Sequence, residues 1–232
     1  MNNSEKKPIR VTFFGDSIFV GQGISIYQGW VTQIARYLDE YGEKIGRQFL
    51  VTNASVNGRT TRQALEDMPY SIQSDGVDIL VVQFGLNDCN YWVTDRGLPR
   101  VSLGAYKENL REIITRGMNF GAHRVLLNNN HPTSRTREFL PNTSITYEDS
   151  NRLYCQEIRA LAAEFGEKVQ FQDIYTYFNE QLIRLHTPIE KFLLIDELHL
   201  SIEGHTAYFN LMLPIILTAV NDFIATEGIL GG

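Results

Sequence analysis

The stretch "RVTFFGDSIFVGQG" (residues 10–23) contains an apolar run that stops abruptly at Gly15. Such a run is typical of a buried strand, and Gly15-Asp16-Ser17 would mark the point where this strand reaches the surface. Asp and Ser commonly form turns or cap helices there, because both side chains bond nearby backbone groups. A nucleophilic serine is the other interpretation of Ser17, and its partners elsewhere in the sequence decide between the two.

Four more short apolar or β-branched runs follow, separated by longer segments in which apolar residues recur with helical period. This alternation predicts an α/β protein, a three-layer α/β/α sandwich around a five-stranded parallel sheet. A last helix is expected from Ser201, its N-cap, with a kink at Pro214. The expected strands are 10–15, 49–54, 78–85, 124–130 and 168–173.

Composition limits the class of protein. The 232 residues, 43% of them hydrophobic, are enough for a single domain (1–232), in which we expect residues 1–8 to be a flexible segment. A net charge of −6 argues against nucleic-acid binding through a broad basic face. Without an 18-residue apolar run or a signal-peptide pattern, we expect a cytoplasmic protein with no membrane span. Cys89 and Cys155 are expected to be free thiols.

Polar residues follow each of the predicted strands. In a parallel sheet, ligands bind at the carboxyl ends of the strands, so these residues are the first candidates for a site. Ser17 follows the first strand, Gly58 the second and Asn87 the third, and Asp196 precedes His199 by three residues near the C-terminus. We therefore expect a serine, a glycine, an asparagine and a histidine with its carboxylate to meet at one edge of the sheet.

These blocks together resemble the GDSL or SGNH hydrolase family, which is named for its Ser, Gly, Asn and His landmarks. "GDSIFVG" (15–21) keeps Gly-Asp-Ser but has Ile-Phe where the family usually shows Leu-Thr. "GLND" (85–88) and the Asp-x-x-His of residues 196–199 match fully, whereas the second block is reduced to a glycine in a loop. The blocks run in the family's order. The resemblance implies a flavodoxin-like SGNH fold and an esterase or acylhydrolase that needs no cofactor or metal.

The chemistry of these residue types also points to a nucleophilic site. A serine hydroxyl needs a neighbouring base, which His199 can supply, and Asp196 can fix the histidine tautomer from the same turn. When Ser17 attacks a carbonyl, negative charge develops on the oxygen and needs fixed donors. The expected oxyanion hole consists of the Ser17 and Gly58 N–H groups and the Asn87 amide, with a glycine at 58 permitting close approach or positive φ.

Other interpretations of the same residues are weaker. Asp196, His199 and His205 could be metal ligands, but no second cluster of ligand residues is spaced to complete such a site. "GQG" (21–23) lacks both the dinucleotide-binding and the phosphate-loop spacing, so no nucleotide cofactor is expected. From other functional classes, an acyltransferase, a lysophospholipase, a thioesterase and a catalytically silent binding domain remain as alternatives.

The expected substrate is a small-molecule ester with a short acyl group, acetyl above all, on a polar or carbohydrate-like alcohol. Six arginines in the segments that follow the second, third and fourth strands suggest an additional phosphate or carboxylate on the substrate. They are Arg59, Arg62, Arg96, Arg100, Arg135 and Arg137. The alternative is that they are solvated loop charges or pair with Glu66, Asp67, Asp95 and Glu138. The polar loop 131–146 argues against a long-chain lipase. Candidate substrate contacts are Asp16, Arg59, Asp88, Tyr91, Trp92, His131 and Arg135, and the oligomeric state is left open.

Overall fold

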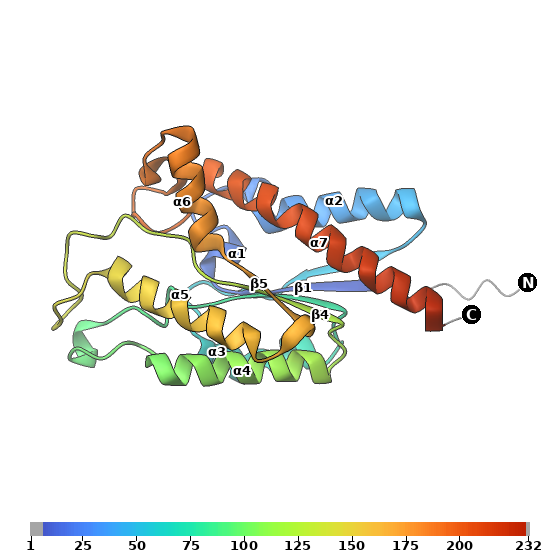
Figure 1. The fold of residues 1–232 in the computed structure, drawn as a ribbon, viewed down its shortest axis with the longest axis horizontal. Helices are drawn as coiled ribbons and strands as arrows, with labels where there is room; N and C mark the ends of the chain where they lie inside the picture. Colours follow the sequence, from blue (N-terminus) through green and yellow to red (C-terminus); the bar gives the residue numbers. More distant parts are fainter. Residues whose placement is uncertain (1–6, 231–232) are drawn as a thin grey trace, which may run out of the picture.

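A computed structural model describes residues 7–230 and the side chains of residues 7–227. Five strands form one parallel sheet, as predicted (Figure 1), and their order in the sheet is β2-β1-β3-β4-β5. They are β1 (Ile9–Gly15), β2 (Phe49–Asn53), β3 (Ile79–Gln83), β4 (Arg124–Asn128) and β5 (Val169–Gln172). The order reverses direction between β1 and β3, which places the ligand crevice of such a sheet at the carboxyl ends of these two strands. The first six residues of the segment expected to be flexible lie outside the described residues.

Helices cover both faces of the sheet, which gives the predicted three layers (Figure 1). One layer contains α1 (Ser17–Val20), α2 (Trp30–Ile45), α6 (Ile174–Leu185) and α7 (Ile202–Leu230). The other contains α3 (Thr61–Met68), α4 (Leu103–Asn119) and α5 (Tyr147–Ala163). Short turns of helix are η1 (Ile26–Gln28), η2 (Pro69–Gln73), η3 (Val93–Asp95), η4 (Gly166–Lys168) and η5 (Ile189–Phe192).

Side-chain caps set where the helices begin. Asp16 caps α1 by accepting a hydrogen bond from the Ile18 N–H at 3.0 Å. Thr60 caps α3 in a capping box with Gln63, which satisfies two backbone donors at once. Ser201, the predicted cap of the last helix, accepts from the Gly204 N–H at 3.2 Å. The caps at the starts of α1 and α3 matter most here, because both helices begin at the carboxyl edge of the sheet.

An aromatic cluster supports the turn that follows β1. The Trp30 ring stacks on Tyr208 at 4.5 Å between centroids and meets the edge of Phe19 at 4.9 Å. Phe13 packs against both Phe19 and Trp30, and all four side chains are buried. Aromatic pairs of this geometry contribute about 0.5–1.5 kcal/mol each beyond their buried area. The cluster therefore holds α1, and with it Ser17, against a rigid part of the core.

Helix α7 is long and strongly apolar. Over Ile202–Glu227 it has the length and composition of a candidate membrane span, with a mean hydropathy of 1.5. In the structure 22% of that window is buried. Tyr208, Met212, Ile216 and Val220 form a stripe at four-residue spacing that packs into the core. Pro214 lies inside the helix, which continues to Leu230.

Candidate active site

Ser17, His199 and Asp196 form a hydrogen-bonded chain at the carboxyl edge of the sheet. Ser17 Oγ lies 2.9 Å from His199 Nε2, and His199 Nδ1 lies 2.5 Å from Asp196 Oδ2. Because an ionised carboxylate can only accept, Nδ1 carries the proton and donates it to Asp196. Nε2 of the neutral ring is then free to accept from the serine hydroxyl, which is the relation between a nucleophile, its base and an orienting carboxylate.

The Asp196 carboxylate is held in its ionised form. Asp196 Oδ1 accepts hydrogen bonds from the Leu198 N–H at 3.0 Å and the His199 N–H at 2.9 Å. Partial burial pushes the pKa of Asp196 upward, but the hydrogen bonds from the His199 ring and from these two N–H groups outweigh it and lower the pKa. Asp196 is therefore suited to orient His199 rather than to exchange protons itself.

The segment that follows β4 fixes the Asp196–His199 turn from one side. Residues 131–135, here called the turn clamp, donate hydrogen bonds to three consecutive carbonyl groups of the turn. The contacts are Arg135 Nε and Nη2 to Asp196 O (3.0 and 2.8 Å), Ser134 N–H to Glu197 O (3.3 Å) and His131 Nε2–H to Leu198 O (2.9 Å). Glu197 has a left-handed φ of 63°, an unfavourable conformation that these bonds help to maintain.

Two backbone donors at the site are unpaired. In the described part of the chain, neither the Ser17 N–H nor the Gly58 N–H has a hydrogen-bond acceptor. Gly58 has a φ of 75°, and a Cβ at this position would meet nothing within 4 Å. The glycine is thus required for its left-handed conformation and not for lack of space. Unpaired N–H groups at the end of two neighbouring strands are what an oxyanion needs.

Asn87 is oriented by contacts at both ends of its amide. Its Nδ2 donates to Asp16 Oδ2 at 3.4 Å, and its Oδ1 accepts from Arg100 Nη1 at 3.3 Å. Arg100 Nη2 also donates to Gly58 O at 3.2 Å. Arg100 therefore connects the segments that carry Gly58 and Asn87, and it turns the NH₂ group of Asn87 toward the Asp16-Ser17 turn.

Two buried carboxyl groups lie behind the site. Burial raises the pKa of Asp16 to about 7, with a further contribution from the charge of Asp88. Burial also raises the pKa of Asp88 to about 6, against the hydrogen bonds that Thr61 donates to it. Both groups thus titrate between pH 5 and 8, although neither is exposed.

The raised pKa of Asp16 leads to a prediction about how stability depends on pH. A carboxyl whose pKa is raised on folding is protonated more readily in the folded state, so the free energy of unfolding falls as pH rises from about 4 to about 7. Asp16→Asn keeps a capping side chain but cannot ionise. Between pH 5 and 8 the variant should lose less stability than the wild type, by up to about 2–3 kcal/mol. Urea unfolding at both pH values measures the difference.

The control for this experiment is Asp39→Asn, which changes an exposed carboxyl on α2 in the same way. Its loss of stability between pH 5 and 8 should match that of the wild type. If Asp16→Asn shows the same loss as Asp39→Asn, Asp16 is not the group responsible.

Four of the seven candidate substrate contacts have side chains that are turned inward. Asp16, Asp88 and His131 are fully buried. Arg59 is 7% exposed, and its guanidinium donates to Ala54 O and forms an ion pair with Asp67 at 2.5 Å. Burial lowers the pKa of His131 to about 4, which keeps the ring neutral in the turn clamp. Of the other three, Trp92 is 52% exposed, whereas Tyr91 and Arg135 are partly buried.

His205, which the sequence left as an alternative metal ligand, has a different role. It is buried, and its Nδ1 accepts a hydrogen bond from the Trp30 N–H at 3.3 Å. Burial lowers the pKa of His205 to about 4, so the ring is a neutral acceptor that joins α7 to the start of α2. Among the residues that the structure describes, no three His, Cys, Asp or Glu side chains are grouped as metal ligands. Cys89 and Cys155 are buried free thiols.

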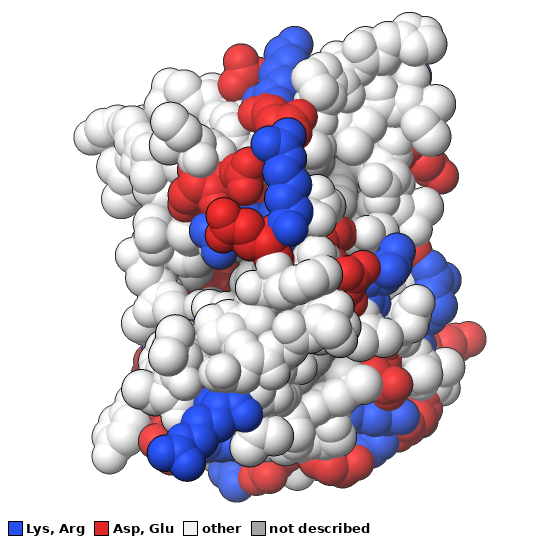
Figure 2. All heavy atoms as spheres, turned by 90° about the vertical axis from the view of Figure 1, so that its left-hand side faces the viewer, with Lys and Arg blue, Asp and Glu red and all other residues white. Residues whose placement is uncertain are grey.

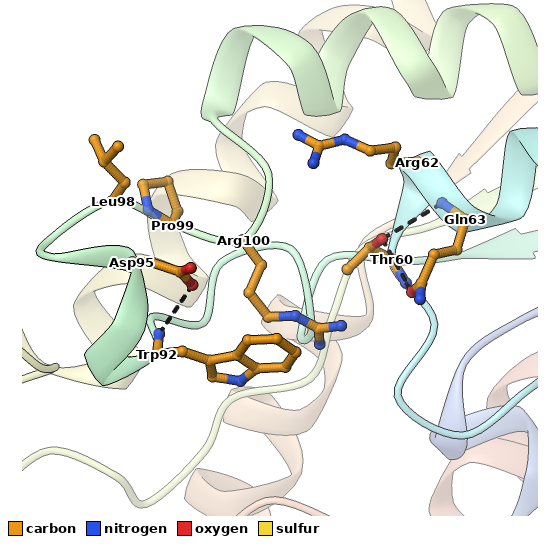
Figure 3. A pocket seen from close by; sticks show the side chains of 8 residues that line it. All are labelled: Thr60, Arg62, Gln63, Trp92, Asp95, Leu98, Pro99 and Arg100. Atoms are coloured by element: carbon orange, nitrogen blue, oxygen red, sulfur yellow. Dashed lines mark hydrogen bonds between the residues drawn. The ribbon is translucent and has the colours of Figure 1, made fainter.

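Two cavities are lined by residues from the segments that follow the strands. One of about 440 Å³ is lined by residues that follow β2 and β3, including Arg62, Trp92 and Arg100 (Figure 3). Another of about 560 Å³ is lined by residues after β4, including Arg135 and Phe139. Figure 2 shows that basic and acidic side chains are interspersed on this end of the molecule.

Comparisons with known proteins identify the family and the fold of this chain. The model of the GDSL-like lipase/acylhydrolase family matches residues 13–207. Esterase TesA of Pseudomonas aeruginosa is 26% identical over 155 residues, which cover 67% of this chain and 70% of TesA. The solved lipase/acylhydrolase from Enterococcus faecalis has a TM-score of 0.67 at 20% identity, covering 90% of this chain and 95% of that one.

The acetylxylan esterase Axe2 from Geobacillus stearothermophilus has a TM-score of 0.68 at 19% identity, covering 89% of this chain and 93% of Axe2. At such identities the two solved structures show the shared fold. The family match spans most of the chain and includes Ser17, Gly58, Asn87 and both residues of the Asp-x-x-His block. This chain therefore belongs to the GDSL-like lipase/acylhydrolase family and is a carboxylic ester hydrolase.

Proposed function

We propose that this protein is a serine esterase that hydrolyses short-chain esters, acetyl esters above all, of a polar, carbohydrate-like alcohol. Ser17 is the nucleophile, His199 the general base and acid, and Asp196 the residue that orients His199. The observation that carries this proposal is the unbroken chain of hydrogen bonds from Ser17 Oγ through the imidazole to the Asp196 carboxylate.

The reaction proceeds in two steps. Ser17 Oγ attacks the ester carbonyl while its proton passes to His199 Nε2, and the imidazolium that forms is stabilised by Asp196. The protonated Nε2 then donates to the leaving alcohol, which leaves an acyl group on Ser17. In the second step His199 removes a proton from water, the hydroxide adds to the acyl carbon, and Ser17 Oγ leaves with the proton from Nε2.

The oxyanion that forms in each step is stabilised by three donors. The N–H groups of Ser17 and Gly58 are unpaired in the described part of the chain, which supports their role here. The NH₂ group of Asn87 faces the Asp16-Ser17 turn and is the third donor. Donors held in place before the reaction starts need no reorganisation when charge develops on the oxygen.

Two observations support a short acyl group and a polar alcohol. The cavity that Arg62, Trp92 and Arg100 line is rich in polar groups. The fold is shared with an acetylxylan esterase, which fits an acetyl group on a carbohydrate. A panel of 4-nitrophenyl esters from acetyl to dodecanoyl, followed by acetylated sugars, tests the proposal. The largest kcat/KM should fall at acetyl or propionyl, and a serine-directed phosphonate should label Ser17. A preference for long chains would overturn the substrate class, and labelling elsewhere would overturn the mechanism.

The turn clamp gives a prediction about a positioning residue. Arg135→Ala removes two hydrogen bonds to Asp196 O, so the Asp196–His199 turn should sample orientations that do not support proton transfer. We expect kcat for acetyl esters to fall roughly ten- to a hundredfold with little change in KM. Arg135→Lys should restore part of the rate, because an ammonium can replace one of the two donors.

Arg137→Ala is the matched control, since Arg137 is an exposed arginine of the same loop. It should leave kcat within about twofold of the wild type, as surface substitutions usually do. A change in KM alone for Arg135→Ala would mean that Arg135 binds substrate rather than positions the turn.

A further inference from the structure

The six arginines expected to surround the site differ in what they contact. Arg59 and Arg135 are used inside the protein, by Asp67 and by the Asp196 carbonyl. Arg62 and Arg100 instead line the cavity of about 440 Å³ that lies beside Gly58, here called the arginine pocket (Figure 3). Their guanidinium groups come from the segments after β2 and β3 and reach toward the same space.

Arg100 is a partly buried cation without a carboxylate partner. Its guanidinium stacks on the Trp92 ring at 4.3 Å and donates to two neutral oxygens, Asn87 Oδ1 and Gly58 O. Within residues 7–227 no carboxylate lies within 4.0 Å of it. These contacts leave part of the five N–H donors of a guanidinium free to bind a ligand.

The other charges of the arginine pocket leave it positive. Arg62, in the first turn of α3, is exposed and forms no ion pair with the described residues. Asp95 is the carboxylate that lines the pocket, and it accepts from the Trp92 N–H at 3.4 Å. Asp88, whose charge also acts on Arg100, is fully buried and bonds Thr61 instead of reaching the pocket. The lining of this pocket therefore carries two guanidinium groups and one carboxylate.

We propose that the arginine pocket binds an anionic oxygen group (a carboxylate, phosphate or sulfate) on the alcohol part of the ester, an inference that rests on the esterase function proposed above. The planar guanidinium matches such groups through paired N–H donors. In a protein of net charge −6 with charges of both signs on this face, an anionic substrate needs a local site of this kind (Figure 2).

The position of Arg100 connects this subsite to catalysis. The same guanidinium contacts Gly58 and Asn87, two of the three proposed oxyanion donors. An anion bound to Arg100 restrains the side chain that orients the Asn87 amide. Binding energy from the non-reacting part of the substrate is then used to order the reacting part, so it should appear in kcat as well as in KM.

Matched ester pairs that differ only in charge test the proposal. One pair is the mono-acetyl ester of methyl glucuronoside and that of methyl glucoside, and the other is 1-acetylglycerol 3-phosphate and 1-acetylglycerol. For the wild type, kcat/KM should be about tenfold higher for at least one anionic member, which also distinguishes a carboxylate from a phosphate site. The advantage should decrease at high salt.

The variants compared are Arg62→Gln and Arg96→Gln. Both remove one exposed positive charge near the site, but Arg96 lies in the loop of η3 and does not line the pocket. Arg62→Gln should reduce the ratio of kcat/KM for the anionic over the neutral ester to about two or three, whereas Arg96→Gln should keep it near the wild-type value. The ratio cancels any general loss of activity.

Binding to the Ser17→Ala variant provides a readout that needs no turnover. Glycerol 3-phosphate and methyl glucuronoside, measured by titration, should bind more tightly than glycerol and methyl glucoside, and Arg62→Gln should abolish this difference.

Equal kcat/KM values within both pairs, or equal effects of Arg62→Gln and Arg96→Gln, would overturn the subsite and leave the esterase in place. Absence of any ester hydrolysis or phosphonate labelling would instead overturn the proposed function, and the binding measurement would then decide on the pocket alone.

Discussion

Ser17→Ala is expected to lower kcat for ester hydrolysis by about 10⁴-fold or more. In the proposed mechanism the Ser17 hydroxyl forms the bond with the acyl carbon, and neither His199 nor the proposed oxyanion donors can replace it. Removing one oxygen at the start of α1 takes little packing from the aromatic cluster below it, so the fold should be kept. Steady-state kinetics with 4-nitrophenyl acetate measure the loss, and circular dichroism with thermal unfolding checks the fold.

Two further proteins make this result specific. Ser55→Ala removes a neighbouring serine at the same edge of the sheet, one whose hydroxyl contacts Phe13 O, and it should retain activity. The double variant Ser17→Ala/His199→Ala should be no slower than Ser17→Ala alone, because residues that act as one unit are not additive. Full additivity of the two losses would mean that His199 does not act through Ser17.

The backbone of the site could be predicted from the sequence because its signals are local. The change from an apolar run to Gly-Asp-Ser placed Ser17 at the end of β1, and parallel strands necessarily bring their carboxyl ends to one edge. The same reasoning placed Gly58 and Asn87 after β2 and β3. The third and fourth strands end two residues earlier than predicted. Residues 84–85 and 129–130 continue the chain beyond these strands but are not part of the sheet.

The direction in which polar side chains point could not be predicted in this way. Asp16, Asp88 and His131 follow strands as catalytic residues do, yet each is buried and supports a neighbour. The hydrogen-bond partners of His131 and Asp16 lie 67 and 71 residues away in the sequence, and no local pattern specifies such contacts. The same holds for the arginines. Their residue type predicted a positively charged edge, but tertiary contacts decide which guanidinium groups remain free to bind a ligand.

The long-range contacts of Arg100 make Asn87 the most informative residue after Ser17. Arg100 fixes the Asn87 amide through its oxygen, so the NH₂ group is presented to the Asp16-Ser17 turn before substrate arrives. Asn87→Ala should therefore lower kcat by roughly 10²–10³, the usual effect of removing one oxyanion donor. KM should change little, because the developing oxyanion accepts this bond more strongly than the ground-state carbonyl does.

Asn87→Asp is the matched variant, since it keeps the size of the side chain and its contact with Arg100 but replaces the donor with an acceptor. It should be at least as slow as Asn87→Ala, because an ionised carboxylate beside the oxyanion repels the charge that forms there. If instead both variants raise KM and leave kcat unchanged, Asn87 binds the ground state and the oxyanion hole consists of the two backbone donors alone. Separate measurements of kcat and KM thus decide whether the Asn87 amide, which Arg100 orients, stabilises the transition state.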